Sequence, residues 1–163
     1  MKKMILATLF AALASTASHA ATLQFPSDAP VASITFPDDW KPEETDTGMQ
    51  AQSPDNAIYI SIDVAAGEGG DKVVSDAIDF LKERGVTIDP ASQTEDEFEV
   101  NGLKVSNLHW SGKDEDGDAS IGLSFTAVSA DKVLVLTYWG TKGEQEKHVA
   151  ELDGILNSLK PAQ

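Results

Sequence analysis

Residues 58–64, Ile58-Tyr59-Ile60-Ser61-Ile62-Asp63-Val64, place a branched apolar side chain at every second position. Side chains that alternate in this way lie on opposite faces of a β-strand. This stretch is therefore predicted to be a half-buried strand, and it is the clearest one in the chain. The turn-forming residues Ser53-Pro54-Asp55-Asn56 precede it, and a short polar strand containing Gln50 and Gln52 is expected after Gly48.

Elements on both sides of this strand can be predicted from turn residues and periodicity. Towards the N-terminus, a strand is expected over Val31–Phe36 and should end at Pro37. Towards the C-terminus, the glycine-rich residues 67–70 end the central strand, and a helix is expected from Asp71 to Gly85. Its apolar residues recur at helical spacing and form one core face: Val73, Val74, Ala77, Ile78 and Leu81.

From Thr94 onward, compact turns separate a series of strand-like segments. Asn101-Gly102, Asp116-Gly117 and Ser129-Ala130-Asp131 each predict a hairpin, so these strands are expected to form an antiparallel meander. Residues 133–136, Val-Leu-Val-Leu, are apolar on both sides. The last strand of the meander is therefore predicted to be central in the sheet and covered on both faces.

One strand of the meander has an unusual apolar pattern. Leu103 and Val105 share one parity, whereas Leu108 and Trp110 take the other. Either a bulge lies near Ser106, or both faces of this strand are covered. The second interpretation is favoured because it agrees with the doubly apolar last strand.

The C-terminal segment is predicted to be a packed helix. Thr141 and Glu144 have the spacing of a capping box, and Pro161 ends the helix. Five apolar residues are expected to form its core stripe: Val149, Leu152, Ile155, Leu156 and Leu159.

These elements predict an α+β fold, with an antiparallel β-sheet and helices on both of its faces. The expected single domain covers residues 31–160, after a lead-in over residues 21–30.

Residues 1–20 are predicted to be a cleavable signal peptide, because two lysines precede an apolar run that ends at Ser18-His19-Ala20. The run is shorter than the roughly 20 residues that span a bilayer, so no stable membrane anchor is expected. The protein is expected to be periplasmic or secreted.

Composition excludes several classes of function. The chain has no cysteine, which excludes disulfides, thiol catalysis and the lipid-bearing cysteine of a lipoprotein. Its 27 acidic residues against 12 lysines and arginines give a net charge of −15. That charge repels phosphate groups, so nucleic acid is not an expected partner.

Several short motifs occur in the order seen in one known group of proteins. They are Phe36-Pro37-Asp38-Asp39-Trp40, Gly48, the Gly102 hairpin, Leu136-Thr137-Tyr138 and Ile155-Leu156-Asn157-Ser158-Leu159. With this order the chain resembles the PsbP-like superfamily, including the bacterial DcrB-type exported proteins. The resemblance implies an α/β/α sandwich and a non-catalytic, protein-binding accessory role. It implies no active site and no metal ligands that can be transferred to this sequence.

Two histidines outside the signal peptide are candidates for chemistry. His109 is expected to be half-buried and hydrogen-bonded to an Asn or to the backbone, with a general base as the alternative. His148 is expected on the exposed face of the last helix, opposite Val149. Glu144 and Glu151 lie on the same side of that helix, so a metal site is the alternative to a solvated polar face.

Two acidic runs are predicted to be exposed. Residues 114–118, Asp-Glu-Asp-Gly-Asp, do not fit the EF-hand spacing and are expected to form a solvated hairpin tip with at most weak divalent-cation binding. Residues 95–99, Glu-Asp-Glu-Phe-Glu, are predicted to be a charged edge strand.

Aromatic residues are the remaining candidates for recognition, and they are Phe36, Trp40, Tyr59, Trp110 and Trp139. Phe36 and Trp40 are expected to pack in the core, and Trp110 is expected to be exposed beside the acidic hairpin. The candidate partner-binding residues are therefore Trp110, Asp114, Glu115, Asp116 and Asp118.

The function expected from the sequence is a non-catalytic periplasmic accessory module that binds another envelope protein, without a cofactor. One alternative is a small hydrolase or metal-dependent enzyme that uses His109 or His148. The other alternative is an immunity or inhibitor protein that neutralises a basic toxin, which the export signal, size and negative charge suggest. The sequence predicts no particular oligomeric state.

Overall fold

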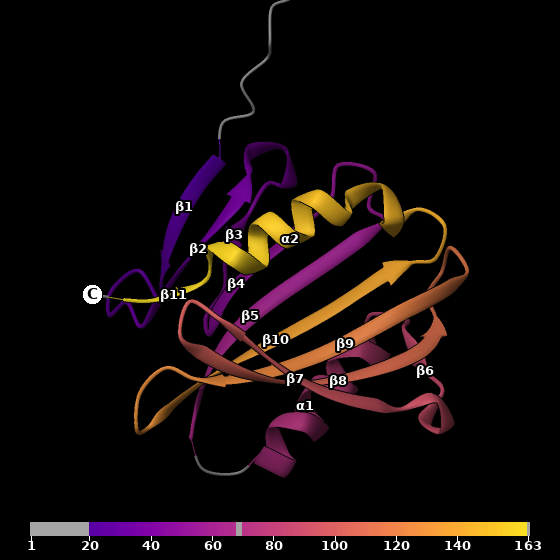
Figure 1. Cartoon of the computed structure of the whole chain (residues 1–163). Helices are drawn as coiled ribbons and strands as arrows, with labels where there is room; N and C mark the ends of the chain where they lie inside the picture. The colour runs from indigo at the N-terminus through magenta and orange to yellow at the C-terminus, as the bar shows by residue number, and fades with distance from the viewer. Residues whose placement is uncertain (1–19, 68–69, 163) are drawn as a thin grey trace, which may run out of the picture.

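The computed structural model describes residues 20–67 and 70–162 (Figure 1). The predicted signal peptide lies outside these residues apart from Ala20. The helices are α1 (Gly70–Glu83) and α2 (Val149–Ser158), with short 3-10 turns η1 (Asp38–Trp40), η2 (Pro90–Ser92) and η3 (Gln145–His148). The strands are β1 (Ala20–Phe25), β2 (Ala32–Pro37), β3 (Glu43–Glu44), β4 (Gly48–Gln52), β5 (Ile58–Ala66), β6 (Thr87–Ile88), β7 (Thr94–Val100), β8 (Leu103–Lys113), β9 (Asp118–Ala127), β10 (Lys132–Thr141) and β11 (Lys160–Pro161).

Antiparallel strands make up most of the described fold. The larger sheet has the order β3-β4-β5-β10-β9-β8-β6, and β7 pairs with β8 beside β6. The smaller sheet has the order β1-β2-β11. The three predicted hairpins are confirmed, since consecutive strands from β7 to β10 pair antiparallel. Asn101 and Gly102 have φ angles of 50° and 81°, a left-handed pair that the Asn-Gly sequence favours.

β10 is the central strand of the larger sheet, between β5 and β9. Leu134 and Leu136 belong to one buried cluster, and Val135 belongs to a second. Consecutive residues of a strand point to opposite faces, so β10 is covered on both sides, as the apolar run predicted.

β8 is also covered on both sides. Its register with β9 runs without interruption from Ser106 to Lys113, and no bulge interrupts it there. Val105 lies in the first cluster and Trp110 in the second. The interpretation of two covered faces is therefore confirmed, and the bulge is excluded over this stretch.

The two helices contribute to different clusters. α2 supplies Ile155 to the first cluster, which also contains Leu159, the residue after α2, and Trp40 of η1. α1 supplies Ala77 and Leu81 to the second. In Figure 1, α2 crosses in front of the large sheet, so its apolar residues reach β5 and β10.

The expected lead-in differs from the structure. Residues 20–25 form β1, which pairs with β2 over its whole length, and Phe25 is fully buried. The alternation of Ala21, Leu23 and Phe25 accounts for this strand, since every second side chain faces the core.

The predicted start of the last helix was wrong. α2 begins at Val149, and Thr141 is the last residue of β10. The Thr141 hydroxyl donates to Asp114 Oδ2 at 2.8 Å, whereas Glu144 forms an ion pair with Lys147. Because both side chains have other partners, the capping box does not form. Val149, expected in the core stripe, is 53% exposed.

Among the described residues, no helix is both long enough and apolar enough to cross a membrane.

Close backbone approach at Gly48 leads to a test of this packing. A Cβ atom at Gly48 would lie 1.9 Å from the carbonyl oxygen of Ile62, so β4 and β5 would have to move apart. Gly48→Ala is expected to lower the free energy of unfolding by about 2 kcal/mol. Gly154→Ala in α2 is the matched control, since nothing lies within 4 Å of its Cβ position and alanine favours helix by about 0.5–1 kcal/mol. Urea unfolding of both variants tests this, and equal stability of the two would contradict it.

Candidate binding site

A depression centred on Tyr59 brings together five parts of the chain. Two adjoining cavities of about 210 and 470 Å³ share Gln52, Asn56, Tyr59 and Arg84 in their walls. We call the combined depression the Tyr59 site. Its walls come from η1 and the residues after it up to Glu43, from β4 through its turn into β5, from Arg84 directly after α1, from the loop between β8 and β9, and from Trp139 of β10.

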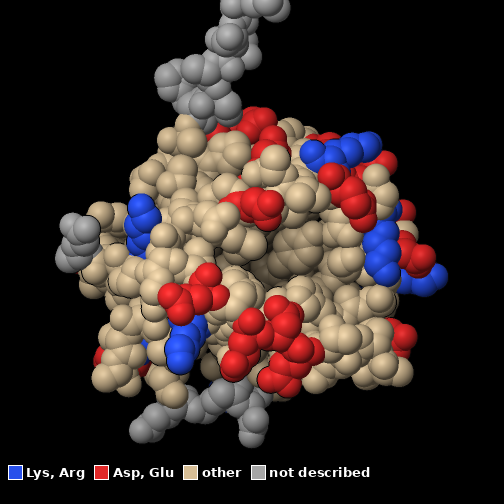
Figure 2. All heavy atoms as spheres, in the orientation of Figure 1, with Lys and Arg blue, Asp and Glu red and all other residues tan. Residues whose placement is uncertain are grey.

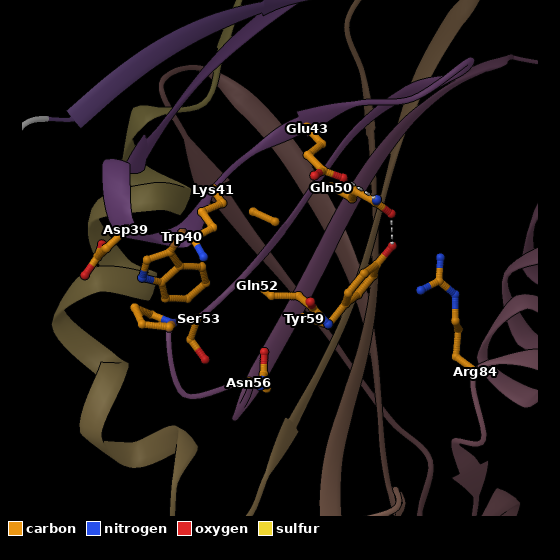
Figure 3. A pocket seen from close by; sticks show the side chains of 12 residues that line it. Asp39, Trp40, Lys41, Glu43, Gln50, Gln52, Ser53, Asn56, Tyr59 and Arg84 are labelled. Atoms are coloured by element: carbon orange, nitrogen blue, oxygen red, sulfur yellow. Dashed lines mark hydrogen bonds between the residues drawn. The ribbon is translucent and has the colours of Figure 1, made fainter.

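Stacked aromatic rings and one guanidinium form the centre of the site. The rings of Tyr59 and Trp139, paired across β5 and β10, stack with centroids 4.1 Å apart. The Arg84 guanidinium lies 5.6 Å from the Tyr59 centroid and 5.0 Å from that of Phe80. Figure 3 shows Arg84 pointing towards Tyr59 from the side of α1, with Trp40 on the opposite side of the site.

Hydrogen bonds hold Tyr59 in a neutral, fixed position. Its hydroxyl donates to Gln50 Oε1 at 2.9 Å, and Gln50 Nε2 donates to Glu43 Oε2 at 3.3 Å (Figure 3). Burial raises the pKa of the Tyr59 hydroxyl above its ordinary value. A phenol with a raised pKa is a poor base or nucleophile at neutral pH, so Tyr59, which is 3% exposed, is a fixed and neutral part of the wall.

Three of the five predicted partner-binding residues line this site: Asp114, Glu115 and Asp116. Asp114 Oδ1 accepts hydrogen bonds from the backbone N–H groups of Asp116 and Gly117 and so shapes the loop. Glu115 and Asp116 are exposed. With Asp55 they make this part of the wall acidic.

The other two predicted residues lie elsewhere. Asp118 is 3.6 Å from Lys113 and faces a different cavity, beside Thr87 and Lys142.

Trp110 was expected to be exposed, and that expectation was wrong because it is 6% exposed in the second cluster. Its indole N–H donates to Gln93 Oε1 at 3.2 Å. Trp110 is buried because β8 is covered on both faces. Phe36 and Trp40 are buried, as predicted.

His148 has a structural position that the helical pattern did not predict. Its side chain is 14% exposed, with Nδ1 2.6 Å from Glu151 Oε2 and Nε2 3.0 Å from Asp55 Oδ2. The hydrogen bond to Asp55, followed by that to Glu151, raises the pKa of His148, and the bond from His148 holds the pKa of Asp55 well below its usual range. Glu151 also accepts from the Trp40 indole at 3.2 Å. The imidazolium thus joins α2, η1 and the turn before β5.

His109 is half-exposed and hydrogen-bonded to an asparagine, as predicted. Its Nε2 lies 2.5 Å from Asn107 Nδ2 and 3.1 Å from Asp96 Oδ1. The Ser124 hydroxyl donates to Asn107 Oδ1 at 2.9 Å. Ser124 is thus directed to the amide and not to the imidazole, so these residues do not form a nucleophile and base pair.

No group of three or more His, Asp or Glu side chains within residues 20–67 and 70–162 is arranged to hold a metal ion. Glu144, a proposed ligand with His148, pairs with Lys147 instead. Weak cation binding by the acidic hairpin stays a prediction.

Arg84 is the residue of this candidate site that the sequence did not point out. It follows the last residue of α1 and is the only arginine of the chain. A lone arginine among lysines is a signal in itself, because a guanidinium stacks on aromatic rings better than an ammonium group does. Tyr59 and Trp139 were recognised as aromatic candidates, but their pairing became visible only through the register of β5 and β10.

Comparisons with known proteins find similarity in structure alone. No family model matches the chain, and no curated protein matches it in sequence. The solved structure of cyanobacterial PsbP (CyanoP) from Synechocystis is similar with a TM-score of 0.59 and 9% identity, over 94% of this chain and 99% of that one. LpqN of Mycobacterium tuberculosis, described as involved in cell envelope biogenesis, has a TM-score of 0.54 and 15% identity, over 89% and 91%. The chain therefore has a PsbP-like fold.

The His148 ion pairs predict a pH dependence of stability. A raised pKa means that stabilisation by the imidazolium is complete below the ordinary histidine pKa and is lost as the pH rises through the folded-state value. Asp55, with its lowered pKa, remains ionised across this range. His148→Gln is expected to cost about 1 kcal/mol at about pH 5.5 and less at about pH 9.

Urea unfolding at the two pH values measures this difference. Glu144→Gln is the matched control, because Glu144 pairs with Lys147 and should show the same change in stability at both pH values. A cost of His148→Gln that does not depend on pH would argue against the charged form.

Proposed function

We propose that this protein is a non-catalytic periplasmic accessory module that binds another envelope protein through the Tyr59 site. The observation that carries the proposal is the arrangement of an aromatic stack, one guanidinium and an acidic wall in one open depression. Such a surface recognises planar and cationic side chains. A partner segment rich in Lys or Arg is the expected ligand, because the acidic residues of the walls outnumber the two cations, Lys41 and Arg84.

The similarities in fold support this proposal. PsbP-like proteins form the family that the sequence resembles, and LpqN is described as involved in cell envelope biogenesis. We infer the finer DcrB-type assignment from the motif order in the sequence. We also infer that the two buried clusters are the two faces of the large sheet, with α1 and α2 covering them as in an α/β/α sandwich.

The enzymatic alternative has less support from the geometry. His148 directs both ring nitrogens at carboxylates, and the hydroxyl of Ser124 donates to Asn107 instead of His109. A hydrolase that uses a serine needs the hydroxyl within hydrogen-bonding distance of its base. Neither histidine has such a partner among the contacts of the described residues.

Partner capture tests the proposed function. Tagged protein is crosslinked mildly in its native envelope, and co-purifying proteins are identified at low and high salt. The double variant Glu115→Lys/Asp116→Lys is expected to lower recovery of the specific partner at least about tenfold, as is high salt, because both remove the attraction of the acidic wall.

Asp28→Lys/Asp46→Lys is the matched control, since it makes the same change of charge at two other exposed positions and should leave recovery unchanged. Equal recovery with both double variants would contradict binding at the Tyr59 site. A basic toxin as the captured partner would support the inhibitor alternative, with the same surface used.

A further inference from the structure

A second cavity lies between α2, β7 and the larger sheet, and it shares no wall residue with the Tyr59 site. We call it the α2 cavity. Its volume is about 190 Å³. Figure 2 shows the hollow below α2, on the face of the molecule that α2 crosses. Its lining residues are Ile60, Phe98, Asn107, His109, Gly122, Ser124, Leu136, Tyr138, Leu152 and Leu156.

The wall of the α2 cavity is mainly apolar. Ile60 and Leu136 come from the sheet, Leu152 and Leu156 come from α2, and Phe98 comes from the edge strand β7. Phe98 is 37% exposed, one of two large apolar side chains that are exposed among the described residues. An apolar cavity of roughly 150 Å³ can take up benzene. The α2 cavity therefore has room for one large apolar side chain.

One end of the cavity is polar. Asn107 and His109 lie there with Asp96, whose Oδ1 is 3.3 Å from Asn107 Nδ2 and 3.1 Å from His109 Nε2. Tyr138 also lines the cavity, but its hydroxyl donates to Gln145 Oε1, and burial raises its pKa to about 12, so it stays neutral. A short cavity that ends in polar groups suits a single side chain of a peptide better than a long hydrocarbon chain.

Acidic residues of β7 and α2 lie beside the opening. Asp96 shares the cavity face of β7 with Phe98, and exposed Asp153 lies on α2. Glu95, Glu97 and Glu99, also exposed, alternate to the other face of this edge strand. Figure 2 shows acidic side chains on both sides of the hollow, over β7 and over α2. Within the described residues, no ion pair joins Glu95, Glu97 or Glu99 to a Lys or Arg. The residues that line the cavity include no Lys and no Arg. The field at this opening favours a cationic ligand.

We propose that the α2 cavity receives one large apolar side chain of a partner peptide segment that carries Lys or Arg on both sides of it. The apolar side chain fills the space between α2 and the sheet, and the flanking cations face the carboxylates of β7 and α2. Burial of the apolar side chain supplies the specificity, and the charges raise the rate of association. This inference does not depend on the Tyr59 site.

The probe is a synthetic peptide with phenylalanine between pairs of lysines. Binding is followed by the methyl NMR signals of Ile60, Leu136, Leu152 and Leu156. The peptide is expected to shift these signals and to bind at least about tenfold more tightly than its alanine counterpart. A peptide with glutamates in place of the lysines should not bind, and added salt should weaken the lysine peptide.

Gly122→Val is the variant that fills the cavity. A Cβ at Gly122 would lie 3.6 Å from Tyr138 Cδ1 and 3.7 Å from His109 Nδ1, which is ordinary contact, so the fold should tolerate it. The variant is expected to lose at least about tenfold in affinity for the phenylalanine peptide. Phe98→Ser, at an exposed position of the edge strand, is the second variant and should weaken binding without affecting folding.

Glu115→Lys/Asp116→Lys is the matched control: it impairs the Tyr59 site, and it should leave unchanged the peptide affinity that is read from the four methyl signals of the α2 cavity. Each of the two proposals can therefore be contradicted without contradicting the other. No shift of the four methyl signals at about 1 mM peptide would overturn this inference. So would equal affinity for the lysine and glutamate peptides, or unchanged affinity in folded Gly122→Val. Self-association of the protein that is lost in Gly122→Val would assign the cavity to a second copy of the chain instead.

Discussion

Burial of β10 on both of its faces is the constraint on which the rest of the fold depends. Leu134 and Leu136 lie in one cluster and Val135 lies in the other, so each face of the strand needs its own cover. Burying an aliphatic side chain of this size contributes about 1.5–3 kcal/mol. Neither helix could be lost without exposing one of these clusters, because α2 supplies Ile155 and α1 supplies Leu81. The chain has no cysteine, so this double cover must stabilise the domain without disulfides.

A sheet that is covered at its centre leaves its ends and edges for recognition. Tyr59 and Trp139 are neighbours near the ends of β5 and β10, where the aliphatic pattern gives way to aromatic rings. His148 fixes one wall of this region, since it joins the Asp55 turn to α2. The Tyr59 site is thus positioned by the same contacts that close the core. The α2 cavity lies beside the edge strand β7, where α2 does not fully cover the sheet.

The parts of the fold that sequence predicted are those that local pattern determines. The apolar run at residues 133–136 identified the central strand, and Asn101-Gly102 identified a hairpin, because both signals lie within a few residues. The burial of Trp110 and His148 depends instead on contacts with distant residues. Asp55 is far from His148 in sequence, and a helical pattern cannot show that the chain makes a 3-10 turn there. For the same reason the stack of Tyr59 on Trp139, and Arg84 beside it, required the register of the sheet.

Negative charge alone cannot distinguish one partner from another on this protein. At physiological ionic strength the Debye length is about 8 Å, so exposed acids distributed over the whole surface attract any cationic segment weakly. Selectivity requires a feature of fixed shape beside the charge. The stacked rings of Tyr59 and Trp139 provide one such feature, and the apolar wall of the α2 cavity provides another. These features differ, since the first favours planar and cationic groups and the second favours a buried apolar side chain. The two proposed sites are therefore expected to select different ligands, although both have acidic surroundings.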